Sequence, residues 1–205
     1  MRIGKSIQLV LMVVILGFGA WITAAPTSTV PQPANTEKAL AEARKVSAEL
    51  SDKVRGLLVD ELGKGGYDGA VKICAEVAQD MTNQFTKRTG HYIRRVSLGY
   101  RNRKDIPDKY EQKKLKLFDQ LNHEKKLEAD YYEVVKEKGQ SYLRYMKPVV
   151  ASAMCVKCHG PKEEVAEPVR KILQEKYPQD RAFGYHAGDV RGAISVKIKL
   201  PATQK

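Results

Sequence analysis

Residues 190–200 read Val-Arg-Gly-Ala-Ile-Ser-Val-Lys-Ile-Lys-Leu, and this stretch decides the fold class. From Val190 to Leu200 every second residue is apolar or glycine, and the residues between them are polar or small. Such a period of two predicts a β-strand in a sheet with one buried face and one solvent-exposed, basic face. Residues 181–186, followed by an Ala-Gly-Asp turn, predict a hairpin partner for this strand.

A second hairpin is expected upstream, because the strand-like residues 131–136 and 141–146 flank Gly139. The N-terminal half has helical spacing instead. Over residues 36–62 apolar side chains recur every three or four positions, which predicts a long amphipathic helix. The glycine-containing segment 63–66 is expected to end it.

Further elements complete the pattern. Asp68 can cap a second helix, whose apolar stripe runs to the glycine at position 90. Residues 91–100 predict a strand, and Pro107 and Pro168 can each open a helix. The predicted fold class is therefore α+β, with an antiparallel sheet, flanking helices and a long N-terminal helix.

The N-terminus carries a targeting pattern. Arg2 and Lys5 precede an uncharged, apolar run that ends in small residues. This layout predicts a secretory signal peptide, with an uncleaved membrane tether through residues 7–25 as the alternative. We therefore expect a periplasmic or otherwise extracytoplasmic protein. The chain divides into signal peptide or anchor, linker and folded domain, at residues 1–25, 26–35 and 36–205.

Composition excludes several classes of protein. A hydrophobic content of 42% argues against disorder, and 29% charged residues argue against a multi-span membrane protein. Three cysteines are too few for a disulfide-stapled mini-domain. The net charge of +12 comes without any nucleic-acid-binding motif. We therefore expect no nucleic acid, and an acidic cofactor, partner or lipid surface instead.

Residues 155–159, Cys-Val-Lys-Cys-His, form the attachment motif of c-type haem. Two cysteines three positions apart can form thioethers with the two vinyl groups of one haem, and the adjacent His159 then becomes the proximal iron ligand. Attachment takes place outside the cytoplasm, and the targeting pattern independently supplies that condition. The expected cofactor is one haem c per chain.

Other chemistries compete for the same cysteines. A thioredoxin-like pair should lie where a strand enters a helix, and this pair follows a proline-containing loop. A disulfide across so tight a spacing would constrain little. A Cys3His zinc site built from Cys74, Cys155, Cys158 and His159 has suitable ligand types, although adjacent Cys158 and His159 would fit two tetrahedral corners poorly.

Cys74 is the cysteine left over once two thioethers have formed. It lies on the apolar stripe of the second helix, so it is either a small buried hydrophobe or the sixth ligand of the iron. A thiolate there would stabilise ferric iron and lower the reduction potential. The other candidates for the sixth position are His91, His186, Met146 and Met154, whereas His123 is expected to face solvent.

Arginines and one methionine complete the candidate cofactor contacts. Arg94, Arg95 and Arg101 could pair with the haem propionates, the alternative being ordinary exposed arginines. Met154, directly before the attachment motif, is expected to pack in the haem pocket.

From about residue 36 to 200 the chain resembles the PAS-like c-type haem domain family, which occurs as exported proteins and as sensor regions of kinases and chemoreceptors. The resemblance implies a PAS-like antiparallel sheet with His159 and Cys74 as axial ligands, and it adds Tyr145 as a candidate cofactor contact. Arg103, Lys104 and Val96 depart from the family pattern. The matching stretches are residues 73–78, 95–102 with 107–108 and 111, 145–148, 154–160, 177–185 and 188–193.

The expected protein is an exported monohaem c-type protein that is not an enzyme, since two axial ligands leave no site for substrate. Its expected role is a redox or gas sensor module. The alternatives are a low-potential electron carrier and a peroxidase-like enzyme in which His91 or His186 would assist. The expected partners are the c-type cytochrome maturation machinery and a redox or signalling protein.

Overall fold

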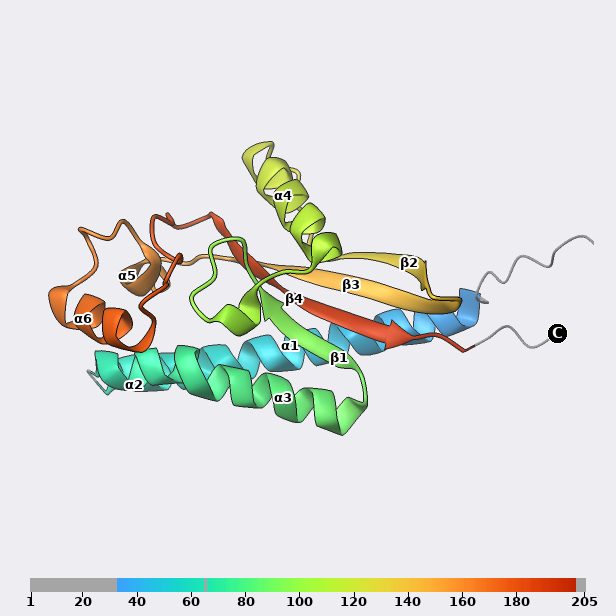
Figure 1. Ribbon diagram of the computed structural model, residues 1–205, viewed down its shortest axis with the longest axis horizontal. Coiled ribbons are helices and arrows are strands. Elements are labelled where there is room, and N and C mark those ends of the chain that lie inside the picture. The colour runs from blue at the N-terminus through green and yellow to red at the C-terminus, as the bar shows by residue number, and fades with distance from the viewer. Residues whose placement is uncertain (1–32, 65, 202–205) are drawn as a thin grey trace, which may run out of the picture.

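The computed structural model describes residues 33–64 and 66–201 (Figure 1). Within these residues no helix has the length and apolar character needed to cross a membrane. In chain order the helices and strands are α1 (Pro33–Gly63), α2 (Tyr67–Lys72), a π-helical segment (Ile73–Val77), α3 (Ala78–Thr89), β1 (Tyr92–Val96), a 3-10 turn (Arg103–Asp105), α4 (Lys109–His123), β2 (Tyr131–Glu137), β3 (Gln140–Val150), α5 (Val156–His159), α6 (Glu167–Lys176) and β4 (Val190–Lys199).

The four strands form one antiparallel sheet in the order β1-β4-β3-β2. The alternating stretch that opened the sequence analysis is the central strand β4, with Ile194 opposite Arg95 on β1 and Lys147 on β3. This confirms an α+β protein and the hairpin around Gly139, where β2 and β3 meet.

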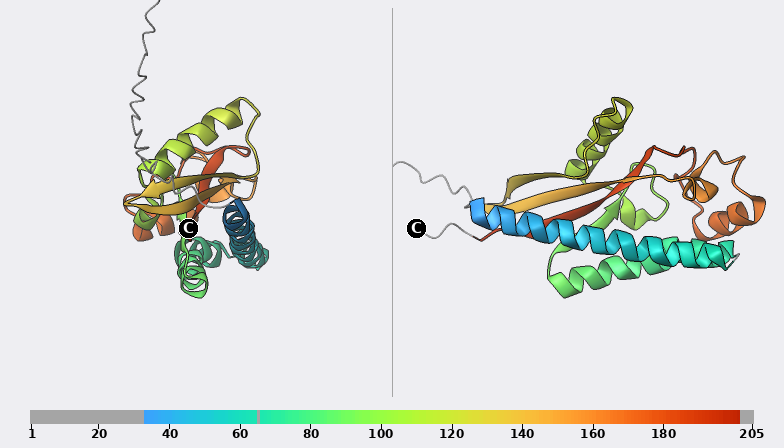
Figure 2. Two further views of the ribbon diagram at one scale, coloured as in Figure 1. Left: turned by 90° about the vertical axis from the view of Figure 1, so that its right-hand side faces the viewer. Right: turned by 180° about the vertical axis from the view of Figure 1, so that it is seen from behind.

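Helices cover both faces of the sheet. The end-on view in Figure 2 places α1 and α3 on one side and α4 on the other. The larger core joins α1 to the sheet, for example Leu50 with Val196, and the smaller core joins Phe118 of α4 to Ala193. The prediction that β4 has one solvent-exposed, basic face is therefore wrong. The apolar side of α4 covers that face, and Ala193 and Ser195 on β4 are buried.

The hairpin predicted between residues 181–186 and β4 is also wrong. β4 pairs with β1 and β3 instead. The backbone of the 181–186 segment bonds to the segment that carries the Cys-x-x-Cys-His motif: the Gly184 amide donates to the Gly160 carbonyl at 2.9 Å, and the Tyr185 amide to the His159 carbonyl at 2.9 Å. Residues 181–186 therefore form a loop, and its backbone hydrogen bonds hold the C-terminal end of α5.

Most helix boundaries follow their local signals. α1 begins at Pro33, inside the stretch interpreted as a linker, since proline suits a first helical turn. α3 ends where Gly90 takes a left-handed φ of 71°. β1 stops at Val96, since the Ser97 amide turns to donate to the Asp105 carbonyl at 3.1 Å. β3 extends to Val150 through a segment predicted as loop, and Pro148 lies opposite Ala193.

A capping box starts α4. The Glu111 amide donates to Oδ1 of Asp108 at 2.7 Å, and the Asp108 amide donates to Oε2 of Glu111 at 2.8 Å. We expect Asp108→Ala to lower the free energy of unfolding by about 1 kcal/mol, and Asp108→Asn to cost less because an asparagine still caps. Urea unfolding followed by circular dichroism measures both; equal losses for the two variants would contradict the cap.

The same carboxylate predicts a pH dependence. Burial raises the pKa of Asp108, but the hydrogen bond from the Glu111 amide and the Arg144 guanidinium outweigh it and leave the pKa below its ordinary 3.8. A depressed pKa means that the stabilisation is complete above the ordinary value and is lost as the pH falls through the folded one. We therefore expect the stability difference between the wild type and Asp108→Asn to shrink below about pH 4.

Candidate functional site

The cysteine motif forms one helical turn. Cys155 is the N-cap of α5, and the amides of Cys158 and His159 donate to its carbonyl at 3.2 and 3.0 Å. Gly160 ends the turn where a Cβ atom would lie 2.6 Å from the Val156 carbonyl oxygen. The turn therefore presents Cys155, Cys158 and His159 together.

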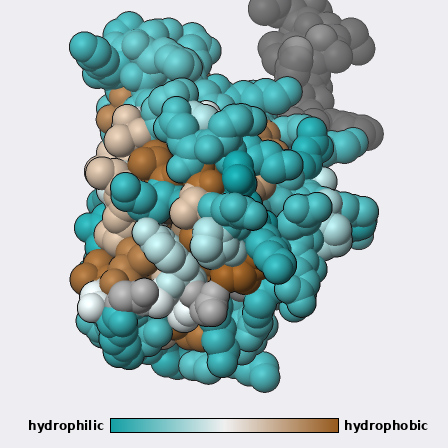
Figure 3. Space-filling model, turned by 90° about the vertical axis from the view of Figure 1, so that its left-hand side faces the viewer, coloured by the Kyte–Doolittle hydropathy of each residue, from teal (hydrophilic) through white to brown (hydrophobic). Residues whose placement is uncertain are grey.

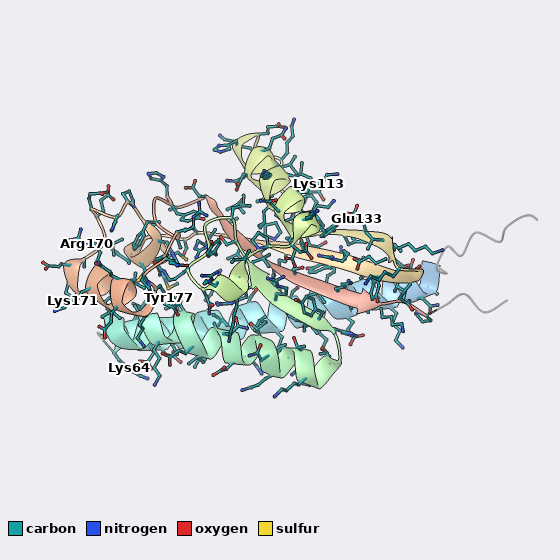
Figure 4. All side chains as sticks on the ribbon, viewed as in Figure 1. Lys64, Lys113, Glu133, Arg170, Lys171 and Tyr177 are labelled. Carbon is teal, nitrogen blue, oxygen red and sulfur yellow. The ribbon has the colours of Figure 1, made fainter. Side chains whose placement is uncertain are left out.

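A cavity of about 530 Å³ lies at the end of the sheet next to α5. The side chains that line it come from α1, the π-helical segment, β1, β3, α5 and β4, and they include Cys155, Cys158, His159, Cys74 and Met154. Figure 3 faces this end of the molecule and shows brown, hydrophobic residues gathered between hydrophilic surfaces. Figure 4 shows Tyr177, another lining residue, beside α6 and α2.

Cys74 reaches this cavity from the π-helical segment. The wider turn interrupts the helix between α2 and α3, and such π-turns often occur at functional sites. Arg95 donates to the Cys74 carbonyl at 3.4 Å. Burial raises the pKa of the Cys74 thiol, and the positive charges of Arg95 and Arg101 oppose this rise. Burial outweighs these charges, so the pKa of the Cys74 thiol stays above its ordinary value.

His159 is oriented by the loop that follows α6. Its Nδ1 atom lies 2.8 Å from the Ala182 carbonyl oxygen. The Arg191 Nε, which only donates, lies 3.3 Å from the same atom, whereas the carbonyl only accepts and is the closer of the two. The shorter contact places the ring proton on Nδ1 and leaves the lone pair on Nε2. Burial, followed by the charges of Arg191 and Arg101, lowers the pKa of His159 well below its usual 6.5. The imidazole is thus neutral, as a metal ligand must be.

The predicted propionate arginines occupy different positions. Arg101 lines the cavity, but its guanidinium already has two partners. Its Nε donates to Asp180 at 2.7 Å, and its Nη2 donates to the Cys158 carbonyl at 2.6 Å. Arg95 also lines the cavity, and its Nε is buried with no hydrogen-bond partner among the described residues. Arg94 does not line it and pairs with Glu111 at 3.2 Å. Arg95 therefore has the most donor capacity left for an anionic group.

The structure separates the remaining candidate ligands from the cavity. Met146 is buried under α4, and His123 lines a smaller cavity of about 250 Å³ beside that helix. His91 pairs with Glu42 at 2.8 Å, and His186 is exposed next to Asp189. Among the residues considered for the sixth ligand, only Cys74 and Met154 line the cavity that holds His159.

Tyr145, expected to contact the cofactor, is a core residue. It is 1% exposed, packs in the cluster between α1 and the sheet, and accepts a hydrogen bond from Ser47 at 3.1 Å. It faces α1, on the same side of the sheet as the cavity, but it lies opposite Val196, two residue pairs beyond the Lys147–Ile194 pair that lines the cavity, and α1 packs directly on it there. The zinc alternative also lacks support: in residues 33–64 and 66–201 no group of three His, Cys, Asp or Glu side chains could hold a metal ion.

Sequence reasoning missed two parts of the site. The apolar residues Leu50, Val54, Leu58 and Leu62 of α1 form a wall of the cavity, and their even helical spacing gave no sign that part of the stripe faces a cavity. Arg191 of β4 was assigned to a wet face, yet it lines the cavity, and its Nε lies 3.3 Å from Nδ1 of His159.

Comparisons with known proteins identify the family and a similar fold. The family model described as Tll0287-like matches residues 32–199. The fold is similar to a solved structure described as the crystal structure of the cyanobacterial haem protein Tll0287, with a TM-score of 0.63 and 24% identity, over 82% of this chain and 98% of that one. The search of curated proteins finds no match. Since the family match spans nearly all of the chain, this protein belongs to the Tll0287-like family.

Proposed function

We propose that the chain is an exported c-type haem protein that acts as a redox or gas sensor module. Its single haem would be bound through thioethers at Cys155 and Cys158, with His159 and Cys74 as axial ligands. The observation that carries the proposal is that Cys74, far away in the sequence, lines the same cavity as the complete attachment motif. The relative with a similar fold is described as a haem protein.

The residues of the cavity suit a haem. Its volume of about 530 Å³ lies in the range of small-molecule sites, which run from roughly 300 to 1,000 Å³. The α1 leucines supply an apolar wall, and the unpartnered Nε of Arg95 can receive a propionate. Haem bound here would supply one-electron chemistry at its iron. The chain would orient the haem, shield it from water and offset the negative charges of its propionates.

Two features favour a sensor. With His159 and Cys74 both bound to iron, no coordination site is open to a substrate, so we propose no enzymatic activity. Cys74 also lies on a π-turn between α2 and α3. Release of the thiolate on reduction or gas binding would free that turn to change its packing, which gives two states that a partner can recognise. A PAS-like arrangement of the sheet fits this role.

A low-potential electron carrier is the second candidate, favoured by the basic surface, which would steer the protein towards an acidic partner. Absorption spectra of the ferric and ferrous protein, with and without carbon monoxide, distinguish the two. A ligand exchange on reduction or on carbon monoxide binding supports the sensor, whereas unchanged six-coordinate spectra support the carrier.

Covalent haem is the first result to test. Exported protein, made in cells with an active c-type maturation system, should stain for haem on a denaturing gel and give a pyridine haemochrome spectrum with one haem per chain. The segment on which export depends, residues 1–25, lies outside the described residues. Colourless protein from such cells, or zinc in place of haem, would overturn the proposed function.

A further inference from the structure

We infer that Arg191 is a positioning residue for His159: its fixed positive charge at the proximal imidazole raises the reduction potential of the iron. This inference rests on the proposed function, because it concerns the iron that His159 would bind. It assigns a role to a side chain that lines the cavity and lies on the Nδ1 side of the His159 ring.

The guanidinium of Arg191 is held rigidly. The Arg191 Nη1 atom donates to the Ser97 hydroxyl at 2.7 Å and to the Gly99 carbonyl at 3.0 Å. The central guanidinium carbon, Cζ, lies 5.2 Å from the centre of the Tyr185 ring. The Ser97 hydroxyl in turn donates to the Arg191 carbonyl at 2.7 Å. These contacts join β4 to the turn after β1 and leave Nε directed at His159.

The charge of Arg191 is not cancelled by an ion pair. Arg101 pairs with Asp180 at 2.7 Å, and Arg95 lies 3.6 Å from Asp105. In the described part of the chain, no carboxylate forms a salt bridge with Arg191. Four arginines line the cavity, namely Arg55, Arg95, Arg101 and Arg191, and among the described residues Arg191 is the one that lies against His159 without a salt bridge.

Two opposing groups meet at Nδ1 of His159. The Ala182 carbonyl, 2.8 Å away, draws the ring proton outward and strengthens the imidazole as an electron donor. The Arg191 Nε lies 3.3 Å from the same atom and opposes any build-up of negative charge on the ring. A ligand held as neutral imidazole stabilises ferric iron less, so the cation favours the ferrous state.

The test is the midpoint potential of haem-loaded variants. Arg191→Gln removes the charge and should lower the reduction equilibrium constant about tenfold, or ~59 mV for one electron. Arg191→Lys keeps the charge and should stay near the wild type. Arg170→Gln is the matched control: the side chain, labelled in Figure 4, donates a hydrogen bond to the Lys162 carbonyl at 3.2 Å and does not line the cavity, and the potential should not move. An unchanged potential in Arg191→Gln, or equal falls in the Gln and Lys variants, would overturn the inference.

A second variant covers the case in which Arg191→Gln does not retain haem. Ser97→Asp keeps Arg191 but places a carboxylate beside its Nη1 atom. Because the carboxylate offsets the positive charge, the variant should also lower the reduction potential of the iron. Haem content is measured first by pyridine haemochrome. Wild-type protein without haem refutes the proposed function, whereas haem-loaded Ser97→Asp with the wild-type potential refutes only the role of Arg191.

Discussion

Replacing Cys74 with serine is expected to change the ferric absorption spectrum and to raise the reduction potential. A thiolate donates charge to ferric iron and stabilises it, and a serine hydroxyl is a much weaker ligand. Each tenfold gain in the ferrous form corresponds to ~59 mV, and we expect the rise to exceed one such step. Spectra and redox titration of the haem-loaded variant measure both effects.

The structure offers a matched control for this experiment. Met154 lines the same cavity and is the other candidate for the sixth ligand. Met154→Leu keeps the volume of the side chain and removes its sulfur, so the ferric spectrum should remain that of the wild type. The reverse pattern, with the spectrum changed by Met154→Leu and unchanged by Cys74→Ser, would assign the sixth position to methionine.

Local signals made much of the fold predictable. The period of two in residues 190–200 predicted the strand β4, and the three-and-four spacing predicted α1. The same spacing predicted one helix from Asp68 to Gly90, where the structure has α2, the π-helical segment and α3. The Cys-x-x-Cys-His motif was recognisable because its three reactive side chains, Cys155, Cys158 and His159, come from one helical turn. The family model matches residues 32–199, and the PAS-like character of the fold stays a prediction.

The errors share a physical cause, because each concerns a residue whose role depends on distant backbone. Residues 181–186 alternate like a strand, but the amides of Gly184 and Tyr185 donate to the carbonyls of Gly160 and His159 and not to a neighbouring strand. Arg191 alternates like a surface residue, but the turn at Ser97 and Gly99 and the Tyr185 ring hold its guanidinium. Tyr145 is two residues from Lys147, which lines the cavity on the same face of β3, but it lies two residue pairs further along the sheet, where the core under α1 is closed.

The π-turn is a different kind of omission. A helical stripe read at 3.6 residues per turn placed Cys74 inward, but it could not detect the extra residue in the turn from Ile73 to Val77. The sequence therefore indicated that Cys74 is inward-facing and gave no indication that it lies in a π-helical segment.

Arg101→Met is expected to destabilise the folded protein by about 3–5 kcal/mol, the usual cost of leaving one partner of a buried ion pair alone. Arg101 is 8% exposed and the Asp180 side chain 5%. Loss of the guanidinium also leaves the Cys158 carbonyl without its donor at 2.6 Å, which loosens the turn that carries the attachment cysteines. Urea unfolding followed by circular dichroism measures the loss, and haem staining should fall with it.

Two comparisons separate this structural role from the predicted contact with a propionate. Arg103→Met removes an exposed arginine, bonded only to Gln179 at 2.9 Å, and should change the stability by less than about 0.5 kcal/mol. Asp180→Leu combined with Arg101→Met should recover part of the loss, because no buried charge is then left unpaired. If instead Arg101→Met keeps its stability within about 1 kcal/mol and loses only haem affinity, the guanidinium serves the cofactor directly, and the ion pair with Asp180 is incidental.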